Sequence, residues 1–111
     1  MARQGDIVLV PVPFSDLSSA KRRPVIVISS DAYQSSTTDM VGVAMTSNLV
    51  VTPYSFVITS ADLDAGTLNH PGRVRVDKIY TLSQSIAVKT FGRVNDATLD
   101  RIRQLLIDLC K

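Results

Sequence analysis

The segment from residue 72 to residue 78 alternates charged residues with valine. Successive side chains of a β-strand point to opposite faces, so a strand here would place its two valines on one face and Arg73, Arg75 and Asp77 on the other. A guanidinium binds phosphate oxygens through two parallel donors, and a carboxylate can accept or donate a proton. The spacing therefore predicts a strand face that is suited to chemistry on a phosphodiester.

The same alternation is also typical of an edge strand whose charged face is solvated and neutralises itself. Charge alternation is common on half-exposed strands, so the segment by itself leaves both interpretations open. Residues elsewhere in the chain have to decide between them.

Polar residues at the ends of two other predicted strands are further candidates. Arg23 stands directly before Pro24, whose ring fixes the chain direction, so Arg23 would hold a defined position at the rim of a strand. Thr46 and Ser47 close a third apolar run and offer two hydroxyl groups that can bind a phosphate. From spacing alone, a plain transition from strand to turn is the simpler interpretation of these two hydroxyl residues.

The net charge of +2 is too small to indicate a nucleic-acid partner by itself. The positive residues nevertheless gather in two places along the chain. These groups are Lys21, Arg22 and Arg23, and Arg73, Arg75 and Lys78. A site for nucleic acid would have to be built from them.

The chain lacks the residues of several other kinds of site. It has one cysteine, one histidine and no cluster with metal-ligand spacing, and its five glycines form no nucleotide-binding loop. We therefore expect neither a metal nor a cofactor. A Ser-His-Asp triad would have to use His70, which stands in a turn-like sequence where an exposed histidine is ordinary.

Cysteine usage and hydropathy indicate the compartment. Cys110 has no partner for an internal disulfide, which fits a reducing environment, and its helical surroundings predict a buried or flanking apolar residue. No apolar run approaches the roughly 18 residues of a membrane span. The N-terminus lacks a signal-peptide pattern. We expect a soluble, cytoplasmic protein with no membrane partner.

Short apolar runs separated by turn residues predict a chain of strands. The predicted strands are 7–12, 24–30, 40–46, 54–59, 73–77 and 85–94. The predicted loops and irregular segments are 14–23, 47–52, 62–69 and 78–83. Between the second and third strands, residues 31–38 could hold a short helical turn.

The last segment predicts an amphipathic helix that begins after Asn95, a suitable N-cap, with Asp96 at the positive helix end. The apolar residues at the spacing of one buried face are Ile102, Leu105, Leu106 and Leu109. Aromatic residues make up only 5% of the chain, so its core must be aliphatic, which favours strands. We predict a mostly β protein: residues 1–111 form one domain, a small, strongly bent antiparallel barrel with a C-terminal helix.

Four short motifs follow one another along nearly the whole chain. They are Gly5-Asp6-Ile7-Val8, Arg23-Pro24-Val25-Ile26-Val27, Thr46-Ser47 and Arg75-Val76-Asp77. Together and in this order they resemble the MazF/PemK (Kid) family of toxins of toxin–antitoxin pairs. The resemblance implies a homodimeric SH3-like barrel that acts as a metal-independent endoribonuclease on single-stranded RNA at short sequences. It also implies inhibition of translation and growth, and neutralisation by a small cognate antitoxin.

The resemblance also implies roles for particular residues. The family's key arginine after the first loop falls on Arg23, and its threonine at the strand end falls on Thr46. The catalytic Arg-x-Asp pair of the PemK branch falls on Arg75 and Asp77. The remaining residues expected to contact RNA are Lys21, Arg22, Ser47, Arg73 and Lys78.

A mechanism follows from these roles. Asp77 would take the proton of the 2′-hydroxyl, Arg23 and Arg75 would stabilise the phosphorane, and the product would carry a 2′,3′-cyclic phosphate. In the scheme of the PemK branch Arg75 also donates the proton to the leaving oxygen. An arginine acid is chemically awkward because the pKa of a free guanidinium exceeds about 12.

Two segments depart from the family pattern. Residues 15–22 lack the glycine and glutamine of many members, and Lys78-Ile79-Tyr80-Thr81 stands where many members have Gln followed by Arg-Thr. These departures leave the cleavage sequence open. Two other functions also stay open: a gyrase poison of the same fold, and a catalytically silent RNA-binding barrel. The gyrase poison relies on a C-terminus that contains tryptophan, which this chain lacks, and this favours the nuclease.

Overall fold

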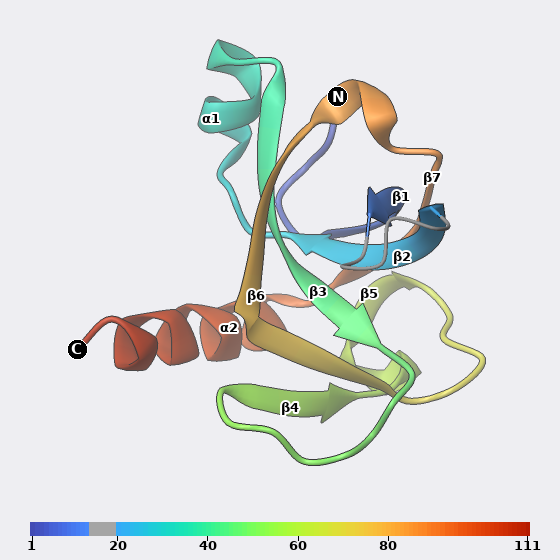
Figure 1. Ribbon diagram of the computed structural model, residues 1–111, viewed down its shortest axis with the longest axis vertical. Coiled ribbons are helices and arrows are strands. Elements are labelled where there is room, and N and C mark those ends of the chain that lie inside the picture. Colours follow the sequence, from blue (N-terminus) through green and yellow to red (C-terminus); the bar gives the residue numbers. More distant parts are fainter. Residues whose placement is uncertain (14–19) are drawn as a thin grey trace.

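The computed structural model of the protein describes residues 1–13 and 20–111, and in this part of the chain seven strands form one antiparallel sheet (Figure 1). The strands are β1 (Asp6–Pro13), β2 (Ala20–Val27), β3 (Asp39–Thr46), β4 (Ser55–Ile58), β5 (Leu63–Gly66), β6 (Gly72–Ser83) and β7 (Lys89–Val94). Their order in the sheet is β4-β6-β3-β2-β1-β7-β5. The helices are α1 (Asp31–Ser36), α2 (Asp96–Leu109) and the single 3-10 turns η1 (Ser60–Asp62) and η2 (Gln84–Ile86).

The sheet curls strongly on itself, and α2 lies against its lower half in the view of Figure 1. This architecture confirms the predicted mostly β fold, a strongly bent antiparallel sheet with a C-terminal helix. Because strand side chains alternate, the curl produces two apolar cores on opposite faces of the sheet. The first core, which α2 covers, contains Ile7, Ile26, Val43, Met45, Phe56, Ile58, Val74, Val76, Val94, Leu99 and Ile102. The second core lies on the other face and contains Val8, Val10, Val25, Val27 and Met40.

Gly42 permits the close packing of β2 against β3 in the curled region. A Cβ at this position would overlap Cγ1 of Val25 and lie 2.9 Å from the carbonyl oxygen of Ile26. Neither obstacle can move freely, because Val25 is fully buried and the carbonyl belongs to the backbone. Glycine is therefore required here because there is no room for a side chain, and not because of a positive φ.

The strands predicted at 7–12, 40–46 and 54–59 are confirmed by β1, β3 and β4, with ends that differ by one residue. The prediction for β2 was wrong at both ends, because the strand begins at Ala20 and stops at Val27. Its polar first residues are held by pairing with β1, where Lys21 lies opposite Val12. A local pattern cannot reveal such a partner. The predicted loop residues 14–19 lie outside the described part of the chain.

Two other segments predicted as irregular are also strands. Residues 78–83 continue β6, because Tyr80 and Leu82 pack against the second core while the backbone pairs with the first half of β3. Residues 63–66 form β5, which pairs with β7 at the edge of the sheet. The strand predicted at 85–94 is shorter, since η2 occupies its start and β7 begins at Lys89.

The helix predictions are confirmed. The side chain of Asn95 accepts a hydrogen bond of 2.9 Å from the backbone N–H of Thr98, as an N-cap should. Leu99 and Ile102 are buried in the first core, with Leu105 and Leu106 packed against it. Cys110 is exposed at the end of α2, so it occupies the flanking position and not a buried one. Residues 31–36 form α1, the short helical turn that was predicted. None of the described helices is long and apolar enough to cross a membrane.

Candidate functional site

The sheet register places predicted site residues from two strands on one face. Arg73 of β6 lies opposite Thr46 of β3, and Arg75 lies opposite Ala44. Directly opposed residues of neighbouring antiparallel strands point to the same side of a sheet. Arg73, Arg75 and Thr46 therefore share a face, as the alternation in the sequence predicts for the two arginines.

Arg23 reaches the same face through β2. Val25 lies opposite Ala44, and Arg23 stands two residues before Val25, which returns its side chain to the same side. Thr46 stands two residues after Ala44, so Arg23 and Thr46 lie toward the same end of their antiparallel strands. Arg23 is half-buried, whereas its neighbour Arg22 is exposed and alternates to the other side. The side chain of Lys21 lies outside the described part of the protein.

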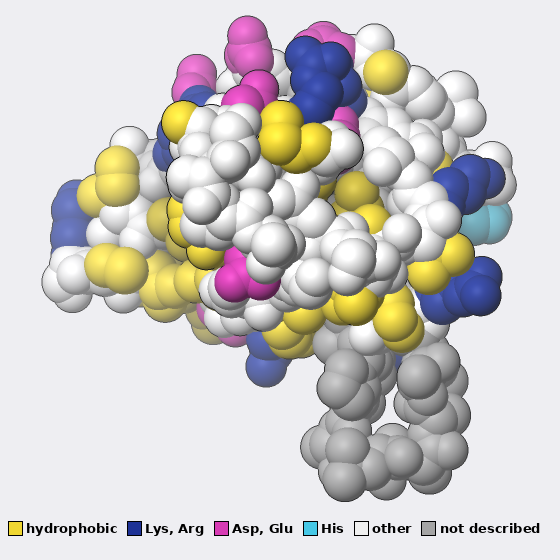
Figure 2. Space-filling view, turned by 90° about the horizontal axis from the view of Figure 1, so that it is seen from above, with side chains coloured by type: hydrophobic (Ala, Val, Ile, Leu, Met, Phe, Trp, Pro, Cys, Tyr) yellow, Lys and Arg dark blue, Asp and Glu magenta, His cyan; other side chains and the backbone are white. Residues whose placement is uncertain are grey.

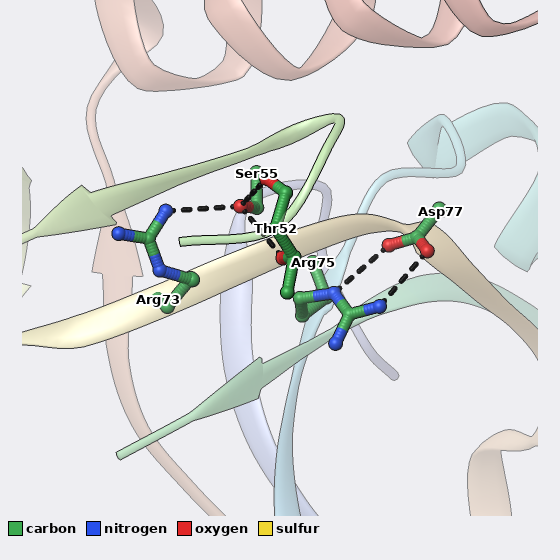
Figure 3. A network of polar contacts seen from close by, with 5 residues as sticks. All are labelled: Thr52, Ser55, Arg73, Arg75 and Asp77. Carbon is green, nitrogen blue, oxygen red and sulfur yellow. Dashed lines mark hydrogen bonds and ion pairs between the residues drawn. The ribbon is translucent and has the colours of Figure 1, made fainter. Parts of the chain in front are cut away.

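Arg75 and Asp77 form a two-pronged ion pair (Figure 3). Nε of Arg75 donates to Oδ1 of Asp77 at 3.0 Å, and Nη2 donates to Oδ2 at 2.9 Å. The side chains are 24% and 31% exposed, so a ligand can approach both groups. The predicted pair of a cation and a proton acceptor is thus assembled and accessible.

The ion pair changes the acidity of both groups. The hydrogen bonds from Arg75 lower the pKa of Asp77 below its ordinary value of 3.8, and this effect outweighs the opposite effect of partial burial. The hydrogen bond to Asp77 raises the pKa of Arg75 above its usual range, and the charges of Asp77 and Tyr80 act in the same direction. At neutral pH Asp77 is therefore ionised and able to accept a proton, whereas Arg75 is a poor proton donor.

The pair sits where β6 leaves its regular pairing with β3. Val43 lies opposite Ile79, but the next residue, Ala44, lies opposite Arg75. Residues 76–78 consequently have no partner in β3 and form a bulge, which is the sharp bend of β6 beside α2 in Figure 1. This bulge contains Asp77, and the exposed Lys78 follows it.

Among the predicted RNA-contacting residues whose side chains the structure describes, Arg73 is the buried one, with 7% exposure. Its Nη1 donates to Oγ of Ser55 at 2.9 Å, and its Nη2 donates to the carbonyl oxygen of Leu49 at 3.3 Å. Figure 3 shows its guanidinium directed toward Ser55 and away from the Arg75–Asp77 pair. In this structure Nη1 and Nη2 of Arg73 therefore donate to oxygen atoms of the protein itself.

Thr46 and Ser47 stand at the end of β3 as predicted. The hydroxyl of half-buried Thr46 accepts a hydrogen bond of 3.1 Å from the backbone N–H of Asn48. Because it accepts there, its own proton remains available for a phosphate oxygen. Ser47 is exposed beside it.

Two features that lie beside the Arg75–Asp77 pair were not identified from the sequence. The segment Thr52-Pro53-Tyr54-Ser55 forms a turn that touches β6, and Tyr80 lies opposite Gly42 on the face that carries Arg75. A Thr-Pro pair is a recognisable turn signal, and Tyr80 is a proton-bearing side chain three residues after Asp77. Neither signal reveals a contact with Arg75 or Asp77, because each contact depends on strand pairing.

Other candidate chemistry is not assembled in the described residues. His70 is exposed, and no group of three His, Cys, Asp or Glu residues converges there. A shallow depression between β1, β5 and β7 contains none of the predicted site residues. Its lining consists of Leu9, Gly66, Thr67, Asn69, Lys89 and Phe91. On the face drawn in Figure 2, lysine and arginine side chains lie in separate groups, and acidic side chains surround the group at the top of the view.

Comparison with known proteins identifies the family of the chain. The sequence model of the family described as PemK-like, MazF-like toxin of type II toxin-antitoxin system matches residues 3–110. No curated protein matches the chain significantly.

Solved structures share the fold. An endoribonuclease from mycobacterial species is similar with a TM-score of 0.75 and 22% identity, over 96% of this chain and 88% of the other. A mycobacterial endoribonuclease in complex with its cognate antitoxin gives a TM-score of 0.74 and 21% identity, over 97% and 93%. A MazE-MazF complex from Deinococcus radiodurans gives 0.75 and 21%, over 98% and 94%.

Proposed function

Because the chain belongs to the PemK-like, MazF-like toxins of type II toxin–antitoxin systems, we propose that it is an endoribonuclease that cleaves single-stranded RNA at short sequences. Cleaved messenger RNA cannot be translated, so this activity would inhibit growth. The observation that carries the proposal is the accessible contact between the guanidinium of Arg75 and the carboxylate of Asp77.

RNA carries its own nucleophile, so the protein has to supply only a base, positive charge and an acid. In the proposed reaction Asp77 takes the proton of a 2′-hydroxyl, whose oxygen attacks the adjacent phosphorus. The bond from phosphorus to the 5′-oxygen then breaks, and that oxygen leaves with a proton. The products are a 2′,3′-cyclic phosphate and a 5′-hydroxyl, and arginine side chains neutralise the charge that a metal ion neutralises in other nucleases.

The ion pair explains how substrate binding can activate the base. In the free protein Arg75 occupies both oxygens of Asp77 and lowers the pKa of that carboxyl. A phosphate oxygen that accepts a hydrogen bond from the guanidinium competes with Asp77 for the same donors. Asp77 then becomes more basic at the moment when the 2′-hydroxyl is nearby.

Arg23 and Thr46 would complete the phosphate site. Both are half-buried on the face of the Arg75–Asp77 pair, so their side chains are held in place more firmly than those of fully exposed residues. We assign to Arg23 the stabilisation of the pentavalent phosphorane, and to the Thr46 hydroxyl a hydrogen bond that orients the phosphate. Exposed Ser47 and Lys78 would contact flanking parts of the RNA.

We assign the proton donor for the leaving oxygen to Tyr80 and not to Arg75. The raised pKa of Arg75 makes it a poor acid. Tyr80 and Arg75 lie opposite Gly42 and Ala44, which stand two residues apart on β3, so the two side chains are neighbours on the same face. A phenol can donate a proton that a guanidinium holds too tightly.

The comparisons also support a proposal about partners. Two of the similar structures are named as complexes of a toxin or endoribonuclease with an antitoxin. We propose that this protein acts in the cytoplasm as a homodimer, binds RNA across the junction of its two subunits, and is neutralised by its own antitoxin.

The function is tested by incubating the purified protein with a long RNA in excess EDTA and mapping the new ends by primer extension. We expect cleavage at a short recurring sequence, with a cyclic phosphate detected on the upstream fragments. An Asp77→Asn protein prepared in parallel controls for contaminating nucleases. Activity that vanishes in EDTA and returns with magnesium would show that the proposed site is wrong.

The same preparation separates the alternatives. A protein that binds the RNA without cutting it would be a silent RNA-binding barrel. A protein that neither binds nor cuts RNA but traps DNA gyrase on DNA would be a gyrase poison.

A further inference from the structure

Tyr54 has an unusual backbone conformation. Of the residues that the structure describes, it is the one non-glycine residue with a positive φ, at 55°. Bulky side chains rarely adopt this left-handed conformation, and such residues persist only where their surroundings hold them. Something in the structure must therefore fix Tyr54 in place.

The carbonyl group of Tyr54 shows what holds it. Its oxygen accepts a hydrogen bond of 3.0 Å from the backbone N–H of Val76, the residue between Arg75 and Asp77. Val76 is fully buried and lies in the β6 bulge, where β3 offers it no partner. Tyr54 and Val76 continue the β4–β6 register beyond the Ser55–Arg75 pair, so this bond is the last one on the β4 side of β6 before Asp77, and it satisfies a buried N–H that would be costly to leave without a partner.

The turn that contains Tyr54 is fastened at its other end by Arg73 (Figure 3). The hydroxyl of Ser55 donates to the carbonyl oxygen of Thr52 at 2.6 Å and accepts from Oγ1 of Thr52 at 2.9 Å. It also accepts the bond from Nη1 of Arg73, while Nη2 of Arg73 holds the carbonyl oxygen of Leu49. One buried guanidinium thus joins both ends of residues 49–55 to β6.

Burying this guanidinium has a cost. Arg73 is 7% exposed and has no ion pair with a described residue, and its buried Nε has no hydrogen-bond partner there. A buried charge is normally paired and fully hydrogen-bonded. The two hydrogen bonds of this guanidinium, to Ser55 and Leu49, therefore compensate for its burial and hold residues 49–55 against β6.

We propose that Arg73 and the 52–55 turn are positioning elements which hold the β6 bulge in the shape that brings Arg75 and Asp77 together. This inference rests on the proposed function only for its catalytic consequence. Arg75 is fixed by strand partners on both sides, Ala44 in β3 and Ser55 in β4. Asp77 has no partner in β3, so its place depends on the bond between Val76 and Tyr54.

The inference is tested through the titration of Asp77, which needs no RNA. Tyr54→Val introduces a β-branched residue that resists a positive φ, and Tyr54→Gly is the matched control, because glycine accepts this conformation without a side chain. Ser55→Ala removes the fastening of the turn with a minimal change of volume. The carboxyl pKa of Asp77 is measured by NMR in the folded wild type and in each variant.

We expect the pKa of Asp77 to rise toward its ordinary value in Tyr54→Val and in Ser55→Ala, and to stay at the wild-type value in Tyr54→Gly. If Tyr54→Val does not fold, Ser55→Ala and Tyr54→Gly still give the comparison. An Asp77 titration that is unchanged in folded Ser55→Ala, or shifted as much in Tyr54→Gly as in Tyr54→Val, would overturn the proposal.

Single-turnover RNA cleavage gives the catalytic readout. We expect a loss of about tenfold or more in Tyr54→Val and Ser55→Ala, because a small misplacement of reacting groups slows a reaction strongly. The acid limb of the pH–rate profile should move to higher pH in the same variants, measured over the pH range in which each variant is still fully folded. If the wild type does not cleave RNA, the proposed function fails while the NMR comparison still decides the positioning role.

Discussion

The guanidinium of Arg75 bonds both carboxylate oxygens of Asp77, although the two residues are only two positions apart on β6. Same-face neighbours on a regular strand are separated by two residue rises, about 6.6 Å. The bulge at residues 76–78 removes this part of β6 from its ladder with β3 and lets the longer side chain span the gap. In the free protein the cation and the base are therefore bonded to each other, and a phosphate has to compete with Asp77 for the donors of Arg75.

Replacing Asp77 by asparagine tests the base. Asn has nearly the same shape but cannot accept the proton, so we expect the single-turnover cleavage rate to fall about 100-fold or more while RNA affinity is retained. Asp64→Asn, at an exposed position on β5, is the matched control and should cleave at the wild-type rate. Near-normal turnover of Asp77→Asn would remove Asp77 as the base.

Arg23 and Arg22 are neighbours whose side chains point to opposite sides of β2. We expect Arg23→Ala to weaken the combined binding and cleavage step by about 1.5–3 kcal/mol, the value of one charge-assisted hydrogen bond. Arg22→Ala removes the same charge from an exposed position off this face, so a much smaller loss is expected. RNA affinity and single-turnover rates measured at one salt concentration give the comparison, and equal losses in both variants would mean that Arg23 acts only through net charge.

The lowered pKa of Asp77 predicts the acid side of the pH profile. In the free protein the carboxylate should remain ionised below pH 3.8, so kcat/KM should show no acid limb from Asp77 between neutral pH and about pH 4. A limb with a midpoint clearly above this range would assign the base to another group.

The lowered pKa of Asp77 also determines how the free energy of unfolding changes with pH. A depressed pKa in the folded state stabilises the protein above the unfolded pKa, and this contribution disappears as the pH falls through the folded value. Asp77→Asn should therefore lower the free energy of unfolding at pH 7 and have less effect in strong acid. Denaturant titrations of the wild type and of Asp77→Asn, at pH 7 and in strong acid, measure the difference in the free energy of unfolding. We expect this difference to be small, because the Arg75–Asp77 pair is partly exposed to solvent.

Tyr80→Phe tests the proton donor. Phenylalanine keeps the ring that packs against the second core and removes only the hydroxyl, so the fold should persist. We expect slower cleavage of ordinary RNA and a rate close to wild type on RNA with a sulfur atom at the scissile 5′ position, because a thiolate leaves without a proton. An equal loss on both substrates would argue against an acid role for Tyr80.

The oligomeric state is checked by light scattering together with activity. We expect a dimer at micromolar concentration, with cleavage activity that falls as dilution separates the subunits. A fully active monomer would contradict the proposal that RNA binds across the subunit junction.

The sequence by itself determined the local parts of this protein. Alternation in residues 73–77 depends only on the two-residue period of a strand, and the cap at Asn95 only on the first turn of α2. Apolar runs likewise marked β1 and β3, and an alternating segment marked β4, to within one residue. Arg75 and Asp77 were found in this way, because their relationship lies within one strand.

The tertiary structure decided everything that depends on a distant partner. β2 starts at Ala20 because β1 pairs with it, and β6 continues past Lys78 because β3 and the second core hold it. Arg73 and Arg75 are the same residue type on the same face of one strand, yet one is buried and the other accessible. Arg73 donates hydrogen bonds to Oγ of Ser55 and to the carbonyl oxygen of Leu49, whereas Arg75 donates to Asp77, and no pattern within residues 72–78 contains the contacts of Arg73.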